Sequence, residues 1–124
     1  METIDVLIVE DDENIRLLYQ DALTGADLKV HTAATATEGI EHALNHHPRV
    51  ILMDIMLPDK SGHEAVAEIR KDDWGKKAKI IFLTNRTDAE NIATAIEQGS
   101  EEYIIKAHTE IKDIINLVRL SMNT

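Results

Sequence analysis

Several apolar runs of this 124-residue chain end in a side chain that could take part in chemistry. The side chains at those ends are Glu10, Asp11, Asp12, Asp54, Thr84 and Lys106. Asp54 is the clearest case, because it follows "VILM" (50–53), a run typical of a buried strand. An ionised carboxylate at the edge of a core is costly unless a cation pairs with it. The sequence therefore raises the question of which cation accompanies Asp54.

The residue types at the other ends suggest an answer. Carboxylates that crowd together repel one another, which raises a pKa or requires a cation. Oxygen ligands without His or Cys suit Mg²⁺, or Mn²⁺ in its place. We predict that Asp54 shares such an ion with Asp11, with the Lys106 ammonium and the Thr84 hydroxyl on its other side. These surroundings suit a carboxylate that receives a phosphoryl group.

The elements that must position these residues follow from the apolar pattern, which alternates between two periods. Strands are expected over 4–9, 28–33, 49–54, 79–84 and 102–106. Helices are expected over 12–23, 35–47, 62–71, 88–98 and 109–122. Three helix starts coincide with a Ser/Thr-x-x-Glu capping box, and the three pairs are Thr35/Glu38, Ser61/Glu64 and Thr87/Glu90.

Alternation of strands and helices with short loops predicts an α/β fold. It implies parallel strands joined by right-handed crossovers, with helices on both faces of the sheet. Such sheets have their sites outside the carboxyl ends of the strands, at the switch point of the strand order. If that point lies beside the first strand, as in the order 2-1-3-4-5, Glu10, Asp11 and Asp54 become neighbours.

Composition narrows the class of protein. The net charge of −10 argues against direct binding to nucleic acid or to an anionic membrane. The chain has no cysteine, no apolar run near membrane-spanning length and no basic start typical of a secretion signal. We expect one soluble, cytoplasmic domain over residues 1–124, with no effector domain in this chain.

Four segments carry a family pattern when they are read in order. They are "LIVEDDENIR" (7–16), "DIMLPDKSG" (54–62), "FLTN" (82–85) and "EEYIIKA" (101–107). Together they resemble the receiver domain of bacterial two-component response regulators, over essentially the whole chain. The resemblance implies a single doubly wound (βα)5 domain with a flavodoxin-like, five-stranded parallel sheet in the order 2-1-3-4-5. It also implies a phosphorylation-dependent signalling switch.

The resemblance assigns the metal and the phosphoryl chemistry to named residues. Asp54 would be the phosphoacceptor, which attacks a phosphohistidine on a sensor histidine kinase or phosphotransfer protein. Asp11 would ligate Mg²⁺ directly, and Glu10 would act largely through water. The backbone carbonyl of Met56 would complete the protein ligands, and Lys106 would bind a phosphoryl oxygen.

The resemblance also implies a switch and an output. Thr84 would move toward the phosphoryl group, and Tyr103 would rotate inward behind it. The output face would be the helix–strand–helix unit over about 87–122, which contacts an output partner that the sequence does not name. The protein would not be a conventional enzyme, because it acts only on its own phosphorylation and dephosphorylation. We expect a monomer or a weak, phosphorylation-dependent dimer.

Three features distinguish this chain. Ala107 follows the strand-end lysine, where most family members have proline after a cis bond. The last helix keeps Arg119 but little else of the charge pattern used by DNA-binding members that dimerise. Met56 and Arg86 flank the path of a hydrolytic water, and because both are bulky we predict a long-lived phosphoryl group.

Two other functions compete with the switch. A receiver-like scaffold that binds a partner without phosphotransfer stays open because of Ala107. A Mg²⁺-dependent phosphohydrolase of the haloacid-dehalogenase type also uses an Asp nucleophile at a strand end. That class expects a second Asp two positions later, where this chain has Met56, and it expects a cap domain.

One further spacing could hold a metal. His42 and His46 lie four positions apart on a predicted helix, as zinc ligands can. His46 and His47 also suit a helix carboxyl end, where positive charge is favoured. We favour the second interpretation from the sequence.

Overall fold

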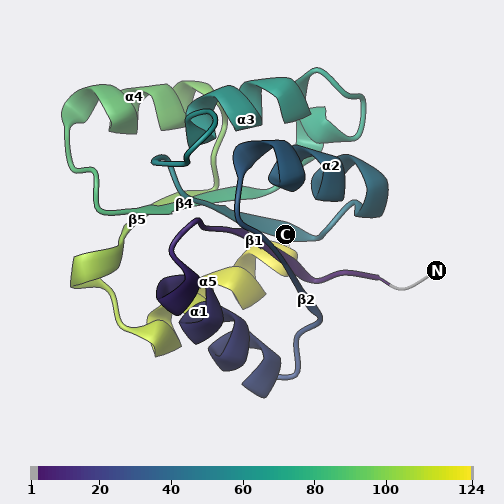
Figure 1. The fold of residues 1–124 in the computed structure, drawn as a ribbon, viewed down its shortest axis with the longest axis vertical. Helices are drawn as coiled ribbons and strands as arrows, with labels where there is room; N and C mark the ends of the chain where they lie inside the picture. Colours follow the sequence, from purple (N-terminus) through teal and green to yellow (C-terminus); the bar gives the residue numbers. More distant parts are fainter. Residues whose placement is uncertain (1–2, 124) are drawn as a thin grey trace.

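The structure is a computed structural model that describes residues 3–123. Strands and helices alternate along the chain, as the apolar periods predict (Figure 1). The strands are β1 (Val6–Val9), β2 (Val30–Ala33), β3 (Val50–Met53), β4 (Ile80–Thr84) and β5 (Glu102–Ile105). The helices are α1 (Glu13–Gly25), α2 (Ala36–His46), α3 (Gly62–Arg70), α4 (Ala89–Glu97) and α5 (Ile111–Met122). Two short 3₁₀ helices, η1 (Gly75–Lys77) and η2 (Lys106–His108), precede β4 and α5.

The strands form one parallel sheet in the order β2-β1-β3-β4-β5, which confirms the predicted fold. Val6 of β1 lies opposite Val30 of β2 on one side and Val50 of β3 on the other. Helices α2, α3 and α4 cover one face of the sheet, and α1 and α5 cover the other (Figure 1). The carboxyl ends of all five strands therefore meet at one edge.

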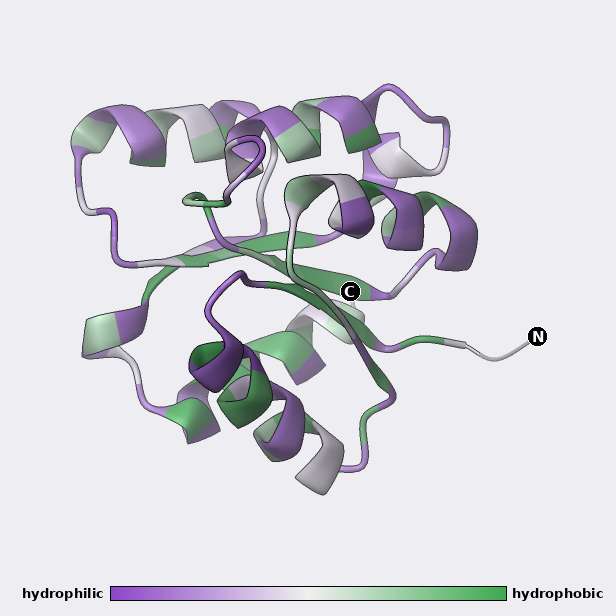
Figure 2. Cartoon of the chain, in the orientation of Figure 1, coloured by the Kyte–Doolittle hydropathy of each residue, from purple (hydrophilic) through white to green (hydrophobic). Residues whose placement is uncertain are grey.

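The three central strands are apolar because they are covered on both faces. β1, β3 and β4 are buried at every position, and they form the hydrophobic band in Figure 2. Alternate residues serve two cores: Leu7, Ile51 and Phe82 face α2 and α3. Ile8, Leu52 and Ile81 face α1 and α5. Burial of each such side chain contributes about 1.5–3 kcal/mol, and this rigid band fixes the strand ends.

Capping sets most helix starts where the sequence predicts them. Thr35 accepts a hydrogen bond from the Glu38 amide, and Ser61 and Glu64 form the full reciprocal capping box. The Thr87/Glu90 box is wrong. Asp88 caps α4 instead by accepting a hydrogen bond from the Asn91 amide, and Arg86 pairs with the same carboxylate at 3.1 Å.

The end of the last strand also differs from the prediction. β5 ends at Ile105, and Lys106 begins η2 rather than completing the strand. The Asn85 side chain accepts a hydrogen bond from the Ala107 amide at 3.0 Å, which links η2 to the residue that follows β4. Within residues 3–123 every peptide bond is trans, including the one between Lys106 and Ala107.

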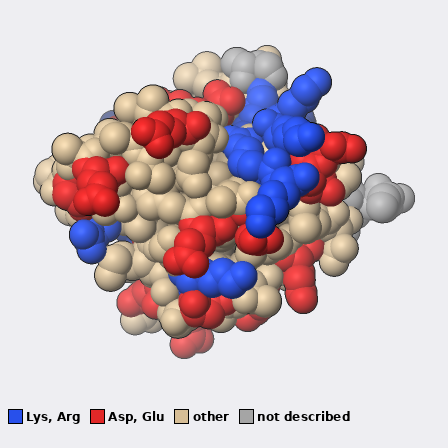
Figure 3. Space-filling view, turned by 90° about the horizontal axis from the view of Figure 1, so that it is seen from above, with Lys and Arg blue, Asp and Glu red and all other residues tan. Residues whose placement is uncertain are grey.

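Charge is unevenly distributed over the surface. Lysine and arginine side chains gather on one side of the face shown in Figure 3, and acidic side chains lie scattered over the rest. The α3–η1 segment, on this face of the sheet, carries Arg70, Lys71, Lys76 and Lys77. In the described part of the chain, no helix is both long and apolar enough to span a bilayer.

Candidate functional site

The carboxyl edge of the sheet brings the predicted acidic residues together. Val9 of β1 lies in register with Met53 of β3, so Glu10 and Asp54 follow at adjacent positions. The Asp54 amide donates to the carbonyl of Val9 at 3.1 Å, which extends the ladder to the site itself. Carboxylate oxygens of Glu10, Asp11 and Asp54 lie within 4.8 Å of one another, and they form a candidate metal centre.

The loop after β3 holds Asp54 in place through a close backbone approach at Gly62. The Gly62 amide donates to the Ile55 carbonyl at 2.8 Å. A Cβ atom at position 62 would lie 2.1 Å from the backbone oxygen of Asp54. Only glycine fits this contact without a backbone shift, so Gly62 helps to set the position of the acidic residue.

Lys106 is the cation that accompanies Asp54 in this structure. Its ammonium group donates to Asp54 Oδ2 at 2.9 Å and also to Glu10 Oε1. All three side chains are nearly buried, with 11%, 8% and 4% exposure for Lys106, Asp54 and Glu10. Asp11 is exposed at the mouth of the site. Asp54 is therefore paired with an ammonium, while Asp11 keeps an exposed carboxylate nearby.

Burial and charge shift the proton affinities of this group. Burial raises the pKa of Glu10 to about 7; the hydrogen bond from Lys106 opposes this rise, and the charge of Asp54 adds to it. Burial lowers the pKa of Lys106, but hydrogen bonds to Glu10 and Asp54 and their charges outweigh it, so its pKa lies above the ordinary value. Lys106 therefore stays protonated, and Glu10 is the group that takes up a proton as the pH falls through neutrality.

Thr84 and Tyr103 both contact the backbone of Arg86, just beyond the end of β4. Thr84 is buried at the end of β4, and its hydroxyl oxygen accepts a hydrogen bond from the Arg86 amide at 3.3 Å. Tyr103 is half-buried, and its hydroxyl donates to the Arg86 carbonyl at 2.7 Å. Both side chains are thus attached to one peptide segment, the start of the β4–α4 loop.

A small hollow opens onto Asp54. It measures about 300 Å³ and is lined by Asp54, Met56, Thr84, Asn85, Arg86 and Lys106. The Met56 amide donates to Asp54 Oδ1 at 3.3 Å, and its side chain is 57% exposed at the rim. Arg86 Nη1 lies 3.4 Å from Met56 Sδ, so the two bulky side chains meet across the opening. The thioether of Met56 cannot donate a proton. The second carboxylate that the hydrolase class expects at this position is therefore missing.

Three residues that support the site were not predicted from the sequence. Arg16 donates to the carbonyls of Glu10 and Asp11, at 3.0 and 3.2 Å, and holds the acidic loop. Asp59 accepts from the backbone amides of Ala36 and Thr37, which ties the loop after Asp54 to the start of α2. Asn85 could have been found, because it is the first polar residue beyond a strand end. The others depend on long-range contacts that leave no local pattern.

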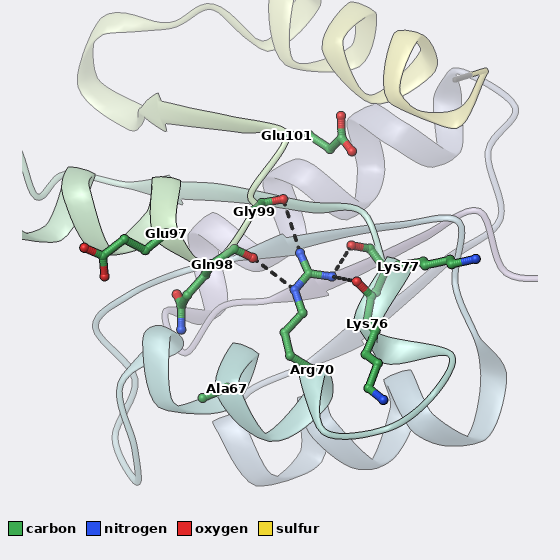
Figure 4. Close-up of a pocket in the computed structure, with 9 residues that line it drawn as sticks. Ala67, Arg70, Lys76, Lys77, Glu97, Gln98, Gly99 and Glu101 are labelled. Atoms are coloured by element: carbon green, nitrogen blue, oxygen red, sulfur yellow. Dashed lines mark hydrogen bonds between the residues drawn. The ribbon is translucent and has the colours of Figure 1, made fainter.

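A larger hollow, about 560 Å³, lies away from these residues beside α3 and η1. Figure 4 shows Arg70 reaching into it from α3. Its guanidinium donates to the carbonyls of Gly75 and Ala78 at 2.8 and 2.6 Å, and to that of Gln98 at 3.0 Å. These bonds tie η1 and the end of α4 to α3, so Arg70 has a structural role here.

The last helix uses its arginine within the molecule. Arg119 Nη2 donates to the carbonyl of Ala26, beyond the end of α1, at 2.9 Å. This bond links α5 to the segment that follows α1.

Comparisons with known proteins converge on one family. The sequence model of the response regulator receiver domain matches residues 6–119. The transcriptional regulatory protein AfsQ1 of Streptomyces coelicolor is 34% identical over 101 residues, which are 82% of this chain and 44% of that protein. This chain spans about half the length of the curated relatives it matches.

Solved structures agree with these sequence matches. A receiver domain protein from Methanospirillum hungatei JF-1, described as CheY-like, aligns with a TM-score of 0.90 and 28% identity, over 98% of this chain and 95% of its own. The BeF3-activated N-terminal receiver domain of Klebsiella pneumoniae RstA aligns with a TM-score of 0.87 and 26% identity, over 97% and 99% of the two chains.

Proposed function

Since this chain belongs to the response regulator receiver domain family, we propose that Asp54 accepts a phosphoryl group and thereby switches its output face. The observation that carries the proposal is that Asp54 lies beside both the Lys106 ammonium and the carboxylates of Glu10 and Asp11. Phosphoryl transfer needs alignment and charge neutralisation more than covalent work by the protein. This edge of the sheet supplies both.

In the proposed reaction an Asp54 carboxylate oxygen attacks the phosphorus of a phosphohistidine in line with the P–N bond. The new O–P bond forms as the P–N bond breaks, and the released imidazole takes up a proton. Glu10, Asp11 and Asp54 fit a hard cation, because they offer oxygen ligands without competing nitrogen or sulfur. Mg²⁺ bound there would neutralise charge on the transferring group. The Met56 backbone carbonyl remains the proposed fourth protein ligand.

Lys106 is proposed to change its hydrogen-bond partner during the reaction. It now donates to Glu10 and Asp54, and a cation held by the carboxylates would free it to donate to a phosphoryl oxygen. The new group carries nearly two negative charges and three acceptor oxygens. Its pull on the Thr84 hydroxyl competes with the Arg86 amide, which now donates to that hydroxyl.

The Arg86 peptide links the two proposed switch residues, because both Thr84 and Tyr103 contact it. Movement of Thr84 disturbs the same segment whose carbonyl holds the Tyr103 hydroxyl. Release of that hydroxyl would let Tyr103 turn inward and repack α4 against β5. The α4–β5–α5 face presents Ile96 and Leu120, which are 71% and 64% exposed. A partner can therefore contact this face and respond to a change in its packing. The switch is then a population shift between two packings.

We propose a histidine kinase or phosphotransfer protein as the donor, with an output partner that reads the α4–β5–α5 face. The domain acts as one unit over residues 1–124, as a monomer or a weak dimer after phosphorylation, and it is not a conventional enzyme. The absence of cysteine fits a reducing compartment such as the cytoplasm.

The test is the intact mass of the protein after incubation with acetyl phosphate or phosphoramidate, with Mg²⁺ or with excess EDTA. One added phosphoryl group is expected with Mg²⁺, none with EDTA and none in Asp54→Asn. Asp73→Asn is the matched control, because Asp73 is a fully exposed carboxylate on a distant loop. Mg²⁺ binding without phosphorylation by these donors or by a phosphorylated kinase would favour the scaffold instead.

A further inference from the structure

We propose that His31, His42 and His46 form a second cation site, specific for a transition metal of the zinc class. One ring nitrogen of each residue lies within 4.8 Å of the others. The site lies on the edge strand β2 and the helix α2, and β1 separates β2 from β3, the strand that Asp54 follows. It is therefore separate from the phosphoryl chemistry proposed above.

The fold supplies the third ligand that the sequence spacing lacked. His42 and His46 lie one turn apart on α2, and His31 projects from β2 toward them. Helix α2 packs close to the sheet at Gly39, where a Cβ atom would lie 2.8 Å from Val9 Cγ2. This close approach lets an imidazole on the strand meet two imidazoles on the helix.

The rings already have the spacing that a shared cation requires. Ring centroids are 5.6 Å apart for His31 and His42, 5.1 Å for His31 and His46, and 5.7 Å for His42 and His46. Three imidazoles on one tetrahedral cation, each bonded at about 2.0–2.1 Å, place their centroids about 5 Å apart. Small side-chain rotations, without movement of the backbone, would bring the nitrogens into bonding distance.

The surroundings of the cluster favour occupancy. His42 Nδ1 is shielded from solvent and has no hydrogen-bond partner among the described residues. A buried imidazole nitrogen in that condition has lost its hydration without gaining a partner. His46 is exposed, so a cation can enter from solvent and keep a water ligand on the open side.

The donor set decides the class of cation. Three imidazole nitrogens suit Zn²⁺, Ni²⁺ or Cu²⁺, whereas the carboxylates around Asp54 suit Mg²⁺. The chain thus offers one candidate site with nitrogen ligands for a transition metal and another with oxygen ligands for Mg²⁺. A cation on the histidines would link the edge strand β2 to α2, and it would stabilise the folded chain by mass action.

The experiment is calorimetric titration of the whole chain with ZnCl₂ in excess Mg²⁺, which keeps the carboxylates occupied. One Zn²⁺ per chain is expected for the wild type. His42→Gln and His46→Gln should each weaken binding at least about tenfold, because even loss of an outer-shell partner costs that much. His108→Gln is the matched control, since His108 is exposed and distant in sequence, and it should bind as the wild type does.

Melting curves provide the second readout. Zn²⁺ should raise the melting temperature of the wild type and of Asp11→Asn, and it should leave His46→Gln unchanged. His46 is exposed, so that variant tests the site without disturbing the core. Equal Zn²⁺ binding in the wild type and both histidine variants would overturn the proposal, as would loss of binding in Asp11→Asn alone. Absence of heat and of any melting shift in the wild type would overturn it too.

Discussion

Lys106 and Glu10, which lie 96 positions apart in the chain, form an ion pair at the carboxyl edge of the sheet. Both side chains are nearly buried, and Asp54 accepts a second hydrogen bond from the same ammonium. Two carboxylates thus share one cation. The excess of carboxylate over ammonium charge suits a second cation at this site.

Folding stability in EDTA should fall as pH rises from about 4.5 toward 7. Burial raises the pKa of Glu10 from 4.5 to about 7, so the folded chain holds this proton more tightly than the unfolded chain does. That contribution to stability is complete below pH 4.5 and is lost as pH rises through about 7. Urea unfolding at several pH values should show the slope in the wild type, and Glu10→Gln should flatten it. An identical slope in both proteins would contradict this.

Lys106→Met should abolish most phosphorylation and also destabilise the fold. The variant leaves Glu10 and Asp54 buried without their cation, which typically costs about 3–5 kcal/mol. Loss of one donor to the developing charge should slow phosphorylation roughly 10²–10³-fold. Mg²⁺ should restore part of the stability and little of the rate, as read by urea unfolding and intact mass. The prediction fails if the variant is phosphorylated at the wild-type rate.

Two glycine-to-alanine substitutions should have opposite effects. Gly62→Ala places a Cβ atom 2.1 Å from the Asp54 backbone oxygen, so we expect a loss of about 1–3 kcal/mol and slower phosphorylation. Gly25→Ala meets no atom within 4 Å at the end of α1 and should stabilise the protein by about 0.4–1 kcal/mol. Chemical denaturation measures both. Similar changes in the two variants would show that the contact at Gly62 is not rigid.

The phosphoryl group should be long-lived, and its lifetime should depend on the two rim side chains. Arg86 and Met56 meet across the hollow that opens onto Asp54. Met56→Ala and Arg86→Ala should each admit water and shorten the lifetime several-fold, while leaving the acceptor in place. Decay of the phosphorylated mass after removal of the donor gives the rate. Loss within seconds from the wild type, without a phosphatase, would refute the prediction.

Tyr103→Phe should loosen the β4–α4 loop without blocking phosphorylation. The variant removes the hydroxyl that donates to the Arg86 carbonyl at 2.7 Å. A hydrogen bond of this kind contributes about 0.5–1.5 kcal/mol, so amides of α4 should exchange with solvent several-fold faster. Hydrogen exchange followed by mass spectrometry measures the effect, with β1 amides as the internal reference. Unchanged exchange in α4 would mean that the tyrosine does not restrain this loop.

The amino-acid sequence by itself determined the fold and which reactive side chains stand at the ends of the strands. Strands are short, apolar and regularly spaced, and a parallel sheet aligns their carboxyl ends, so Asp54, Thr84 and Lys106 had to lie at one edge. Local periodicity carries this information, because it reflects which faces of each element are buried. Capping at Ser61 was predictable for the same reason, since its partners lie within one turn.

Only the tertiary structure decided which of these groups pair. The Lys106–Glu10 bond, the Asp59 contacts with α2 and the approach of His31 to α2 all join residues distant in sequence. No spacing rule encodes them, because they depend on how closely packed layers approach one another. The Thr87 box failed for a related reason: two adjacent residues could each cap α4, and the contact of Arg86 with Asp88 favours the second. The sequence pattern shows on which helix or strand each side chain lies, and the packing of the layers decides which residues it contacts.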